Sequence, residues 1–254
     1  MGIVNVTPDS FSDGGAFLDT QAAIGHGRRL LAEGADWLDV GGESTRPGAS
    51  PVGLDQELER VVPVIEALAA DGWVSVDTTK PAVARAAVAA GARMVNDVSS
   101  SLAPVCAELG VAWVAMHRQG QPATMQDAPA YDDVVTEVAE ALQTSVDQAR
   151  VLGVADIWID PGIGFGKTTD HNLDLLARLD VLVGLGAPVL VGASRKRFLG
   201  RLHALADGRD DDVGPDDRLE GSLAVATWAA HAGAAMVRVH DVAPTVQAMH
   251  VVAA

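Results

Sequence analysis

The chain has 254 residues, of which 48% are hydrophobic and 20% are charged, and its formal net charge is −16. This length suits one domain with a sizeable core. The acidic balance argues against a general nucleic-acid surface, because phosphate backbones are bound by basic surfaces. The single cysteine, Cys106, excludes an intrachain disulfide, and no apolar run is long enough to span a membrane. We therefore expect a cytoplasmic protein without nucleic-acid or membrane partners.

Eight short apolar runs recur along the chain, and most of them end in a polar or charged residue. They occupy residues 2–5, 37–39, 74–77, 94–96, 113–117, 157–160, 189–194 and 237–240. Helical spacing of apolar residues is found at 20–34, 54–70, 80–90, 131–152, 171–185, 219–232 and 243–253. From Asn5 to Arg238 the runs recur every ~33 residues, which is enough for one strand, one helix and two loops. This pattern predicts an α/β protein, a single (β/α)8 TIM barrel domain over residues 1–254, with its active site at the carboxyl ends of the strands.

Three connections are longer than the others. Those at 7–19 and 41–53 follow the first two runs and are rich in Pro, Asp, Ser and Gly. We interpret them as functional loops at the catalytic rim, because long ordered loops there usually serve function. The third, at 201–218, contains Asp210–Asp212 and Asp216–Asp217, and its charge predicts a solvated surface loop before the seventh predicted helix.

Two glycine-rich motifs and the histidines do not fit familiar sites. The segment 160–168 ends in Gly-Lys-Thr, but Pro161 stands where a phosphate-binding P-loop needs glycine. The segment 192–196 has Lys196 where a nucleophile elbow requires glycine. No closely spaced pair of histidines has a third partner, so a zinc site is not expected.

Basic residues gather beside the ends of the apolar runs although the chain as a whole is acidic. They are Arg46, Lys167, Arg195, Lys196, Arg197 and Arg238. This rim indicates an anionic small-molecule substrate, with ordinary solvated charges as the alternative. Arg238 and His240 are two apart on a strand and share one face. An anion is their natural partner, because guanidinium binds phosphate through two hydrogen bonds, and an arginine–carboxylate bridge closing the barrel is the alternative.

Asp77, Asn96 and Asp160 end three different strands of the predicted barrel. Their side chains should therefore converge on its axis. Two carboxylates and a carboxamide offer the donors and acceptors that a flat, nitrogen-rich heterocycle needs. Capping of the following loops is the alternative for any one of them, but the set of three favours a heterocycle pocket.

Longer motifs resemble those of the dihydropteroate synthase family over essentially the whole chain. They are Asn5–Gly15, Asp39–Gly48, Ser75–Thr78, Asn96–Val98, Met116–His117, Asp160–Lys167, Gly192–Gly200 and Arg238–Val242. That family joins 6-hydroxymethyl-7,8-dihydropterin pyrophosphate to p-aminobenzoate in folate synthesis and releases pyrophosphate. The resemblance implies these two substrates, magnesium (Mg2+) as cofactor, and a homodimer.

The resemblance also implies roles for individual residues. The expected catalytic residues are Asp77, Asn96, Asp160, Lys196, Arg238 and His240. The first four would hold the pterin with Met116 against its ring, and Arg238 and His240 would bind the pyrophosphate, with Asn5 as a magnesium ligand. The p-aminobenzoate, or a sulfonamide in its place, would contact Phe165, Lys167 and Ser194. Loop residues complete the set: Phe11 in the first loop, Thr45, Arg46 and Pro47 in the second, and Asp39, which would help to order these loops.

The implied mechanism is dissociative, with pyrophosphate leaving before the neutral aryl amine attacks a cationic pterin methylene. Two alternatives stay open. A pterin-binding methyltransferase would not need Asn5, Arg238 and His240, and a non-catalytic paralogue would bind pterin without turnover. One departure from the family pattern is Ser99–Ser101, where glycines are usual. A positive φ in this loop would carry a steric cost for serine.

Overall fold

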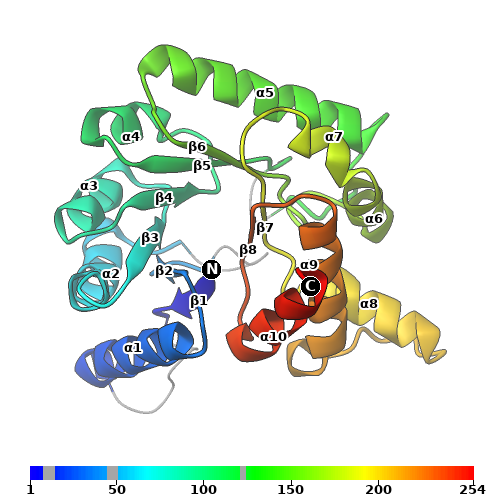
Figure 1. Ribbon diagram of the computed structural model, residues 1–254, viewed down its shortest axis with the longest axis horizontal. Helices are drawn as coiled ribbons and strands as arrows, with labels where there is room; N and C mark the ends of the chain where they lie inside the picture. The colour runs from blue at the N-terminus through cyan, green and yellow to red at the C-terminus, as the bar shows by residue number, and fades with distance from the viewer. Residues whose placement is uncertain (8–14, 45–50, 121–123) are drawn as a thin grey trace.

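The computed structural model describes residues 1–7, 15–44, 51–120 and 124–254, with only the backbone described for 15–19. Within these ranges the strands are β1 (Gly2–Asn5), β2 (Trp37–Gly41), β3 (Trp73–Asp77), β4 (Met94–Asp97), β5 (Ala112–Met116), β6 (Ile157–Asp160), β7 (Leu190–Val191) and β8 (Met236–Val237). Strands β1 to β6 form one parallel sheet in chain order, and β7 pairs with β8. Bridges from Ile159 to Val189 and from Gly2 to Val239 join this pair to β6 and β1. The strands therefore close into a ring that the helices surround, and the predicted (β/α)8 barrel is confirmed (Figure 1).

Helices follow most of the strands, as the apolar spacing predicts. Those of the described ranges are α1 (Gly15–Ala32), α2 (Leu54–Leu68), α3 (Pro81–Ala89), α4 (Ala103–Leu109), α5 (Val134–Leu152), α6 (Thr169–Ala177), α7 (Leu179–Val183), α8 (Arg197–Ala206), α9 (Leu219–His231) and α10 (Val242–Val252). The prediction of one helix over 171–185 was wrong, because Arg178 leaves helical geometry, with φ of −114° and ψ of 34°, and separates α6 from α7.

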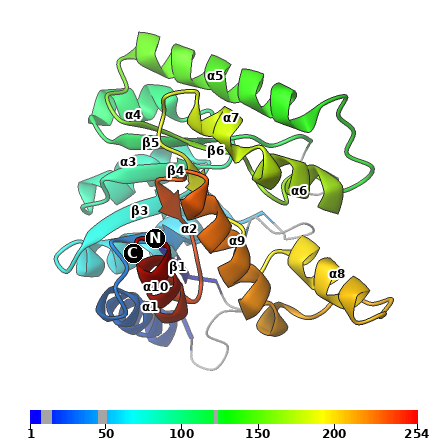
Figure 2. The same cartoon turned by 45° about the vertical axis from the view of Figure 1, so that its right-hand side comes forward.

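The prediction of a loop over 201–218 was wrong for its first part, where α8 continues to Ala206. This helix buries Phe198, Leu199 and Ala204, and it stands out from the ring of helices in Figure 2. Its apolar face covers only ten residues, which is too short to give a clear helical period beside the acidic run that follows. The acidic part itself is largely exposed and contains one 3-10 turn, at Pro215–Asp217.

Strand side chains alternate between two separate apolar cores. Residues such as Val40, Val76 and Ile159 belong to a large core shared with the helices. The smaller core consists of Met1, Trp37, Met94, Ala112, Val114 and Leu190, with Trp158 and Met236 packed against it. Because successive strand residues point to opposite faces, Trp37 and Asp39 share the interior face. The small core therefore fills the barrel beneath the polar residues at the carboxyl ends of the strands.

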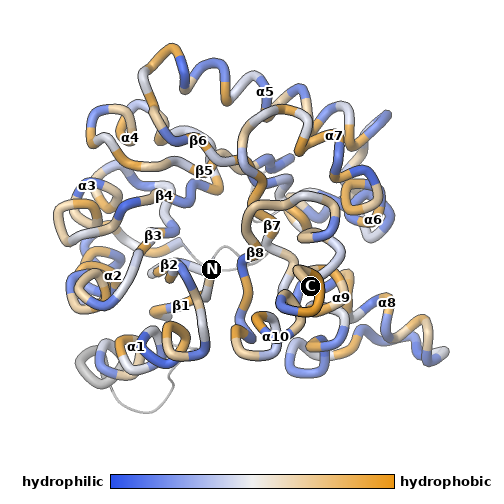
Figure 3. Tube along the Cα trace, viewed as in Figure 1, coloured by the Kyte–Doolittle hydropathy of each residue, from blue (hydrophilic) through white to orange (hydrophobic). Residues whose placement is uncertain are grey.

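The helices are amphipathic, and hydrophobic and hydrophilic stretches alternate along them, for example along α5 (Figure 3). This is expected of helices that cover a barrel on one side and meet water on the other. In the part of the chain that the structure describes, no helix is both long and apolar enough to cross a membrane.

Candidate active site

Four polar side chains, from β2, β3, β4 and the residue that follows β8, bond to one another inside the barrel. Arg238 donates through Nε to Asp39 and through Nη2 to Asp77, at 2.5 and 2.9 Å. Asn96 donates through Nδ2 to the same Asp39 oxygen at 2.9 Å. The other oxygen of Asp39 is buried and has no hydrogen-bond partner among the described residues. The arginine–carboxylate bridge that the sequence left open is thus present, with Asp39 and Asp77 as its two acids.

One guanidinium faces two carboxylates in this cluster, so one negative charge is in excess. Burial raises the pKa of Asp77 to about 7, and Asp39 adds to the rise although Arg238 opposes it. Burial disfavours the charge of Arg238, but Asp39 and Asp77 outweigh this and raise its pKa. The arginine therefore stays charged, and Asp77 holds its proton more readily than an exposed aspartate does.

Asp160 and Lys196 form a second polar group, close to the first one at the same end of the barrel. Asp160 ends β6 and accepts a hydrogen bond from the Gly162 amide at 2.7 Å. Burial raises the pKa of Asp160, and Lys196 opposes this rise. Lys196 donates to the Ile163 carbonyl and lies 4.0 Å from the centre of the Phe165 ring. Burial lowers the pKa of Lys196 to about 8. The structure thus brings an acid, Asp160, an amine, Lys196, and the aromatic ring of Phe165 together in one place.

Lys167 is only 3% exposed and bonds to its own loop. Its Nζ donates to the carbonyls of Gly162 and Phe165, both at 3.1 Å, and lies 2.9 Å from Nδ1 of His117. These three acceptors match the three N–H groups of an ammonium. Burial lowers the pKa of Lys167 to about 7 and that of His117 to about 3, which keeps the imidazole neutral and able to accept. The structure shows Lys167 bracing the loop, and its direct contact with p-aminobenzoate stays a prediction.

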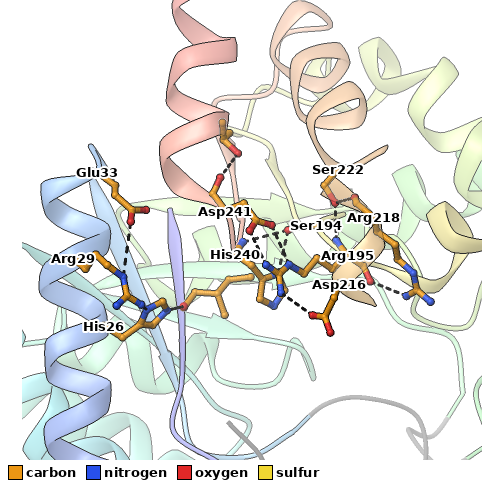
Figure 4. A network of polar contacts seen from close by, with 12 residues as sticks. His26, Arg29, Glu33, Ser194, Arg195, Asp216, Arg218, Ser222, His240 and Asp241 are labelled. Atoms are coloured by element: carbon orange, nitrogen blue, oxygen red, sulfur yellow. Dashed lines mark hydrogen bonds and ion pairs between the residues drawn. The ribbon is translucent and has the colours of Figure 1, made fainter. Parts of the chain in front are cut away.

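Ser194 and His240 meet where β7 and β8 end (Figure 4). The Ser194 hydroxyl lies 3.1 Å from His240 Nδ1 and accepts from the His240 amide at 3.2 Å. Next to them, Arg195 donates to both carboxylate oxygens of Asp241, at 3.0 and 2.6 Å. The predicted pyrophosphate residue His240 is therefore in direct contact with the predicted p-aminobenzoate residue Ser194.

The backbone between Ser194 and Lys196 is kinked, because Arg195 has a left-handed φ of 58°. This conformation costs ~1–2 kcal/mol for a residue with a Cβ. Two contacts hold it, since the Arg195 amide donates to Ser222 Oγ at 2.9 Å and its carbonyl accepts from Arg218 Nη1 at 2.9 Å. Figure 4 shows Arg218 and Ser222 beside Arg195. The kink places Ser194 beside His240 and Lys196 beside Phe165.

The serine-substituted fourth loop contains one positive φ, at Ser100 with φ of 52°. Its hydroxyl donates to the Met116 carbonyl at 2.9 Å, which offsets part of the steric cost. Asp97 holds the same loop by accepting from the amides of Ser99 and Leu102, at 2.9 and 2.7 Å. The serines therefore leave the loop braced, and Asn96 keeps its place in the buried cluster.

The remaining predicted residues fall into two groups. Asn5 ends β1 and is half-buried, and Met116 ends β5 and is buried. Phe11, Thr45, Arg46 and Pro47 lie outside the described residues. Among the described residues, no three His, Cys, Asp or Glu side chains are placed to hold a metal ion.

Three residues of this region were not assigned a role from the sequence. They are His117, Gln126 and Tyr131, which bond to Lys167 or to the loop at 161–168. His117 lies in the Met116–His117 motif, but that motif did not indicate its bond to Lys167, and Gln126 and Tyr131 lie in no motif. Their partners are 35 to 50 residues away along the chain. A low aromatic content with a single tyrosine is the one signal that could have drawn notice to Tyr131.

Residues 1–240 match the model of a family described as pterin binding enzyme. The chain belongs to this family. The dihydropteroate synthase of Mycobacterium leprae is 52% identical over 100% of this chain and 92% of its own. The structure of the Yersinia pestis dihydropteroate synthase with a sulfonamide drug has a TM-score of 0.91 at 46% identity and covers 100% of this chain and 92% of that one. The Xanthomonas albilineans enzyme with 4-aminobenzoic acid has a TM-score of 0.89 at 52% identity, covering 99% and 90%.

This pterin-binding enzyme is a transferase of folate synthesis, as its curated relatives are. The pterin-binding methyltransferase considered above is not favoured, because relatives 47% and 52% identical over the whole chain are dihydropteroate synthases. The roles of its individual site residues rest on the geometry described here and on the resemblance of their motifs.

Proposed function

We propose that this enzyme condenses 6-hydroxymethyl-7,8-dihydropterin pyrophosphate with p-aminobenzoate, giving 7,8-dihydropteroate and pyrophosphate. One observation carries the proposal. At one end of the barrel, the buried cluster of Asp39, Asp77, Asn96 and Arg238 lies with Lys196, which is beside the Phe165 ring. The cluster offers acceptors for the N–H groups of a pterin, and the ring offers a stacking surface for a second flat substrate. The relatives solved with a sulfonamide drug and with 4-aminobenzoic acid support this choice of second substrate.

In the proposed mechanism, the bond between the pterin methylene and the pyrophosphate oxygen breaks first, and its electron pair leaves with the oxygen. Asp160 would stabilise the positive charge that spreads from the methylene into the pterin. The neutral aryl amine then attacks through its lone pair, and its extra proton passes to water or to the departing pyrophosphate. No strong base is required, so positioning and electrostatic stabilisation supply the rate.

Arg238 would bind the leaving pyrophosphate while it keeps its hydrogen bonds to the carboxylates of Asp39 and Asp77. A guanidinium has five N–H groups, and the bonds to Asp39 and Asp77 use two of them. The others can meet phosphate oxygens, whose added negative charge is best tolerated when Asp77 is protonated or bound to the pterin. His240, on the same interior face, would contribute beside it.

Magnesium would assist by neutralising charge on the pyrophosphate. Asn5 is the residue that would hold it, and it supplies one neutral oxygen at the end of β1. Such a small donor set fits a cation that arrives on the substrate and keeps most of its ligands from phosphate and water. A protein-made cage is not needed for that role.

The test is pyrophosphate release by the purified protein with dihydropterin pyrophosphate, magnesium and p-aminobenzoate. Release that requires p-aminobenzoate and yields dihydropteroate supports the proposal, and chelation of magnesium should suppress it. Absence of release, with pterin still binding in calorimetry, would favour the non-catalytic paralogue and contradict the proposal.

Substitutions should separate the ring-holding residues from the loop residues. Asp160→Ala and Lys196→Ala should each weaken pterin binding by ~100-fold or more, because each leaves a charged group without its partner. Arg46→Ala should slow turnover while pterin affinity is largely kept. Calorimetric titration and steady-state kinetics measure the two effects. Equal loss of pterin affinity in all three variants would contradict this division of roles.

We further propose a homodimer located in the cytoplasm. Leu173 of α6 and Trp228 of α9 are 39% and 50% exposed, and Trp228 donates to the Leu176 carbonyl at 2.7 Å, so the two helices adjoin. A twofold contact would cover this apolar surface. The free cysteine, Cys106, suits a reducing compartment. Sedimentation equilibrium should give twice the chain mass of 26.2 kDa, and a monomer at micromolar concentration would contradict the dimer.

A further inference from the structure

The loop between β6 and α6 has an unusual arrangement of hydrogen bonds. From Gly162 to Gly166, each of five successive carbonyls accepts a hydrogen bond from a side chain. The pairs are Gly162 with Lys167 at 3.1 Å, Ile163 with Lys196, Gly164 with Gln126 at 2.6 Å, Phe165 with Lys167 at 3.1 Å, and Gly166 with Tyr131 at 2.8 Å. The loop is thus held at its backbone, by its own Lys167 and by three side chains from other segments, Lys196, Gln126 and Tyr131.

This loop needs external support because three of its residues are glycines in the left-handed region. Gly162, Gly164 and Gly166 have φ of 66°, 81° and 62°. Glycine reaches these angles easily, but it also leaves them easily when nothing holds the chain. The segment after β5 lies close against the loop, since a Cβ on Gly162 would come within 1.8 Å of the His117 carbonyl and one on Gly166 within 2.2 Å of the Gln119 carbonyl.

Gln126 and Tyr131 hold the carbonyls on the two sides of Phe165. Gln126 bonds to Gly164, the residue before Phe165, and Tyr131 bonds to Gly166, the residue after it. The Phe165 ring is half-buried and lies 4.0 Å from the Lys196 Nζ. A rotation of the peptide at either of these carbonyls would shift the backbone next to Phe165 and so move this ring relative to Lys196.

Tyr131 is well placed to act as a permanent donor. Its ring packs edge-on against His171, with ring centres 5.0 Å apart. Burial raises the pKa of Tyr131 to about 12, so its hydroxyl keeps its proton over the whole working range of pH. Both Tyr131 and Gln126 come from the segment between β5 and α5, so two separate loops of the barrel rim are joined here.

We propose that Gln126 and Tyr131 are positioning residues of the p-aminobenzoate pocket, which fix the Phe165 ring by holding the carbonyls of Gly164 and Gly166, the residues before and after it. This inference rests on the proposed function for the identity of the ligand. It assigns neither residue a contact with substrate, because both side chains bond to backbone carbonyls.

Two conservative variants test the proposal, each with a matched control. Tyr131→Phe deletes one hydroxyl–carbonyl bond, and Thr144→Val deletes the one between Thr144 and Glu140 within α5. Gln126→Met removes the amide at nearly constant size, and Gln143→Met does the same at a residue that bonds to Asp147 on α5.

We expect the KM for p-aminobenzoate to rise ~5- to 20-fold in Tyr131→Phe and Gln126→Met, and not in the controls. The Kd for the pterin pyrophosphate, measured without p-aminobenzoate, should stay within ~2-fold.

Amide hydrogen exchange of the peptide covering 161–168 provides a readout that does not depend on activity. It should become faster in both variants and stay unchanged in both controls. Unchanged exchange, or an equal weakening of both substrates, would overturn the proposal. If the unmodified enzyme forms no dihydropteroate, the proposed function fails, while the exchange result still decides whether Gln126 and Tyr131 hold the loop.

Discussion

Where β2, β3, β4 and β8 end, side chains bond to side chains, whereas in the loop after β6 side chains bond to the backbone. Arg238, Asp39, Asp77 and Asn96 form the first arrangement. The second consists of five carbonyls between Gly162 and Gly166 that accept from side chains of several elements. The two arrangements lie at the same end of one barrel and hold their parts of the site by different means.

The difference matters for binding. Side chains that bond to one another can exchange a partner for a ligand while the backbone stays still, and the excess carboxylate in the cluster is an unfavourable charge that a ligand can relieve. A loop bonded through its carbonyls cannot exchange partners without changing shape. The first region should therefore respond to ligand and pH through electrostatics, and the second should be formed before the ligand arrives.

The largest effect is expected at Asp77. Asp77→Asn keeps the shape of the side chain and removes the excess negative charge from the cluster. We expect pterin affinity to fall by ~100-fold, because a charge-assisted bond is lost. The free energy of unfolding at pH 8 should nevertheless rise by ~2 kcal/mol or more, because a buried carboxylate no longer has to ionise. Calorimetry and urea denaturation measure the two quantities.

Asp156→Asn is the matched control, since Asp156 is exposed just before β6. It should change neither quantity. A loss of stability in Asp77→Asn would show that the Arg238 bridge stabilises the fold, and that the cluster is not held at an electrostatic cost.

The pH dependence of the free energy of unfolding should reveal the ionisation of Asp77 as well. The pKa of Asp77 is about 7 in the folded protein, above its ordinary 3.8, so the folded state binds this proton more tightly than the unfolded chain. Its contribution to stability is complete below pH ~4 and is lost as the pH rises through about 7. The stability difference between Asp77→Asn and the unmodified protein should therefore grow from pH 4 to about 7 and then level off. A difference that stays constant over this range would exclude the raised pKa.

The residues of the first region could be found from the sequence because each one ends an apolar run. Asp77, Asn96 and Asp160 lie at or near the ends of short, largely buried strands, and a period of two decides which face their side chains share. Arg238 and His240 follow the same rule just after β8. The bond between Arg238 and Asp39, which are 199 residues apart, was open as an alternative and needed the closed barrel to be seen.

The second region could not be found in this way. Gln126 and Tyr131 end no strand, and their partners are carbonyls, which every residue carries and no sequence pattern marks. Lys167 was expected in the substrate pocket because its motif suggested it, but a motif does not say whether a lysine turns toward the ligand or toward its own loop. The helix α8 was not predicted for a related reason, because ten residues beside an acidic run are too few to show a clear helical period.

The smallest effects are expected around Arg195, where both kinds of contact meet in one residue. Its side chain pairs with Asp241, and the two side chains are 34% and 22% exposed, so Asp241→Asn should cost ~1 kcal/mol or less and leave pterin affinity within ~3-fold. Its backbone amide donates to Ser222, which is 6% exposed, and Ser222→Ala would leave that amide without an acceptor in a left-handed conformation. Lys196 follows Arg195 directly in the chain, so Ser222→Ala should weaken pterin binding by ~10-fold.

Arg85→Gln, at an exposed pair with Glu108, serves as the control and should change neither binding nor the melting temperature. If Asp241→Asn weakened pterin binding more than Ser222→Ala did, side-chain pairing and not backbone support would place Lys196, and the two regions of the site would not differ in the way described.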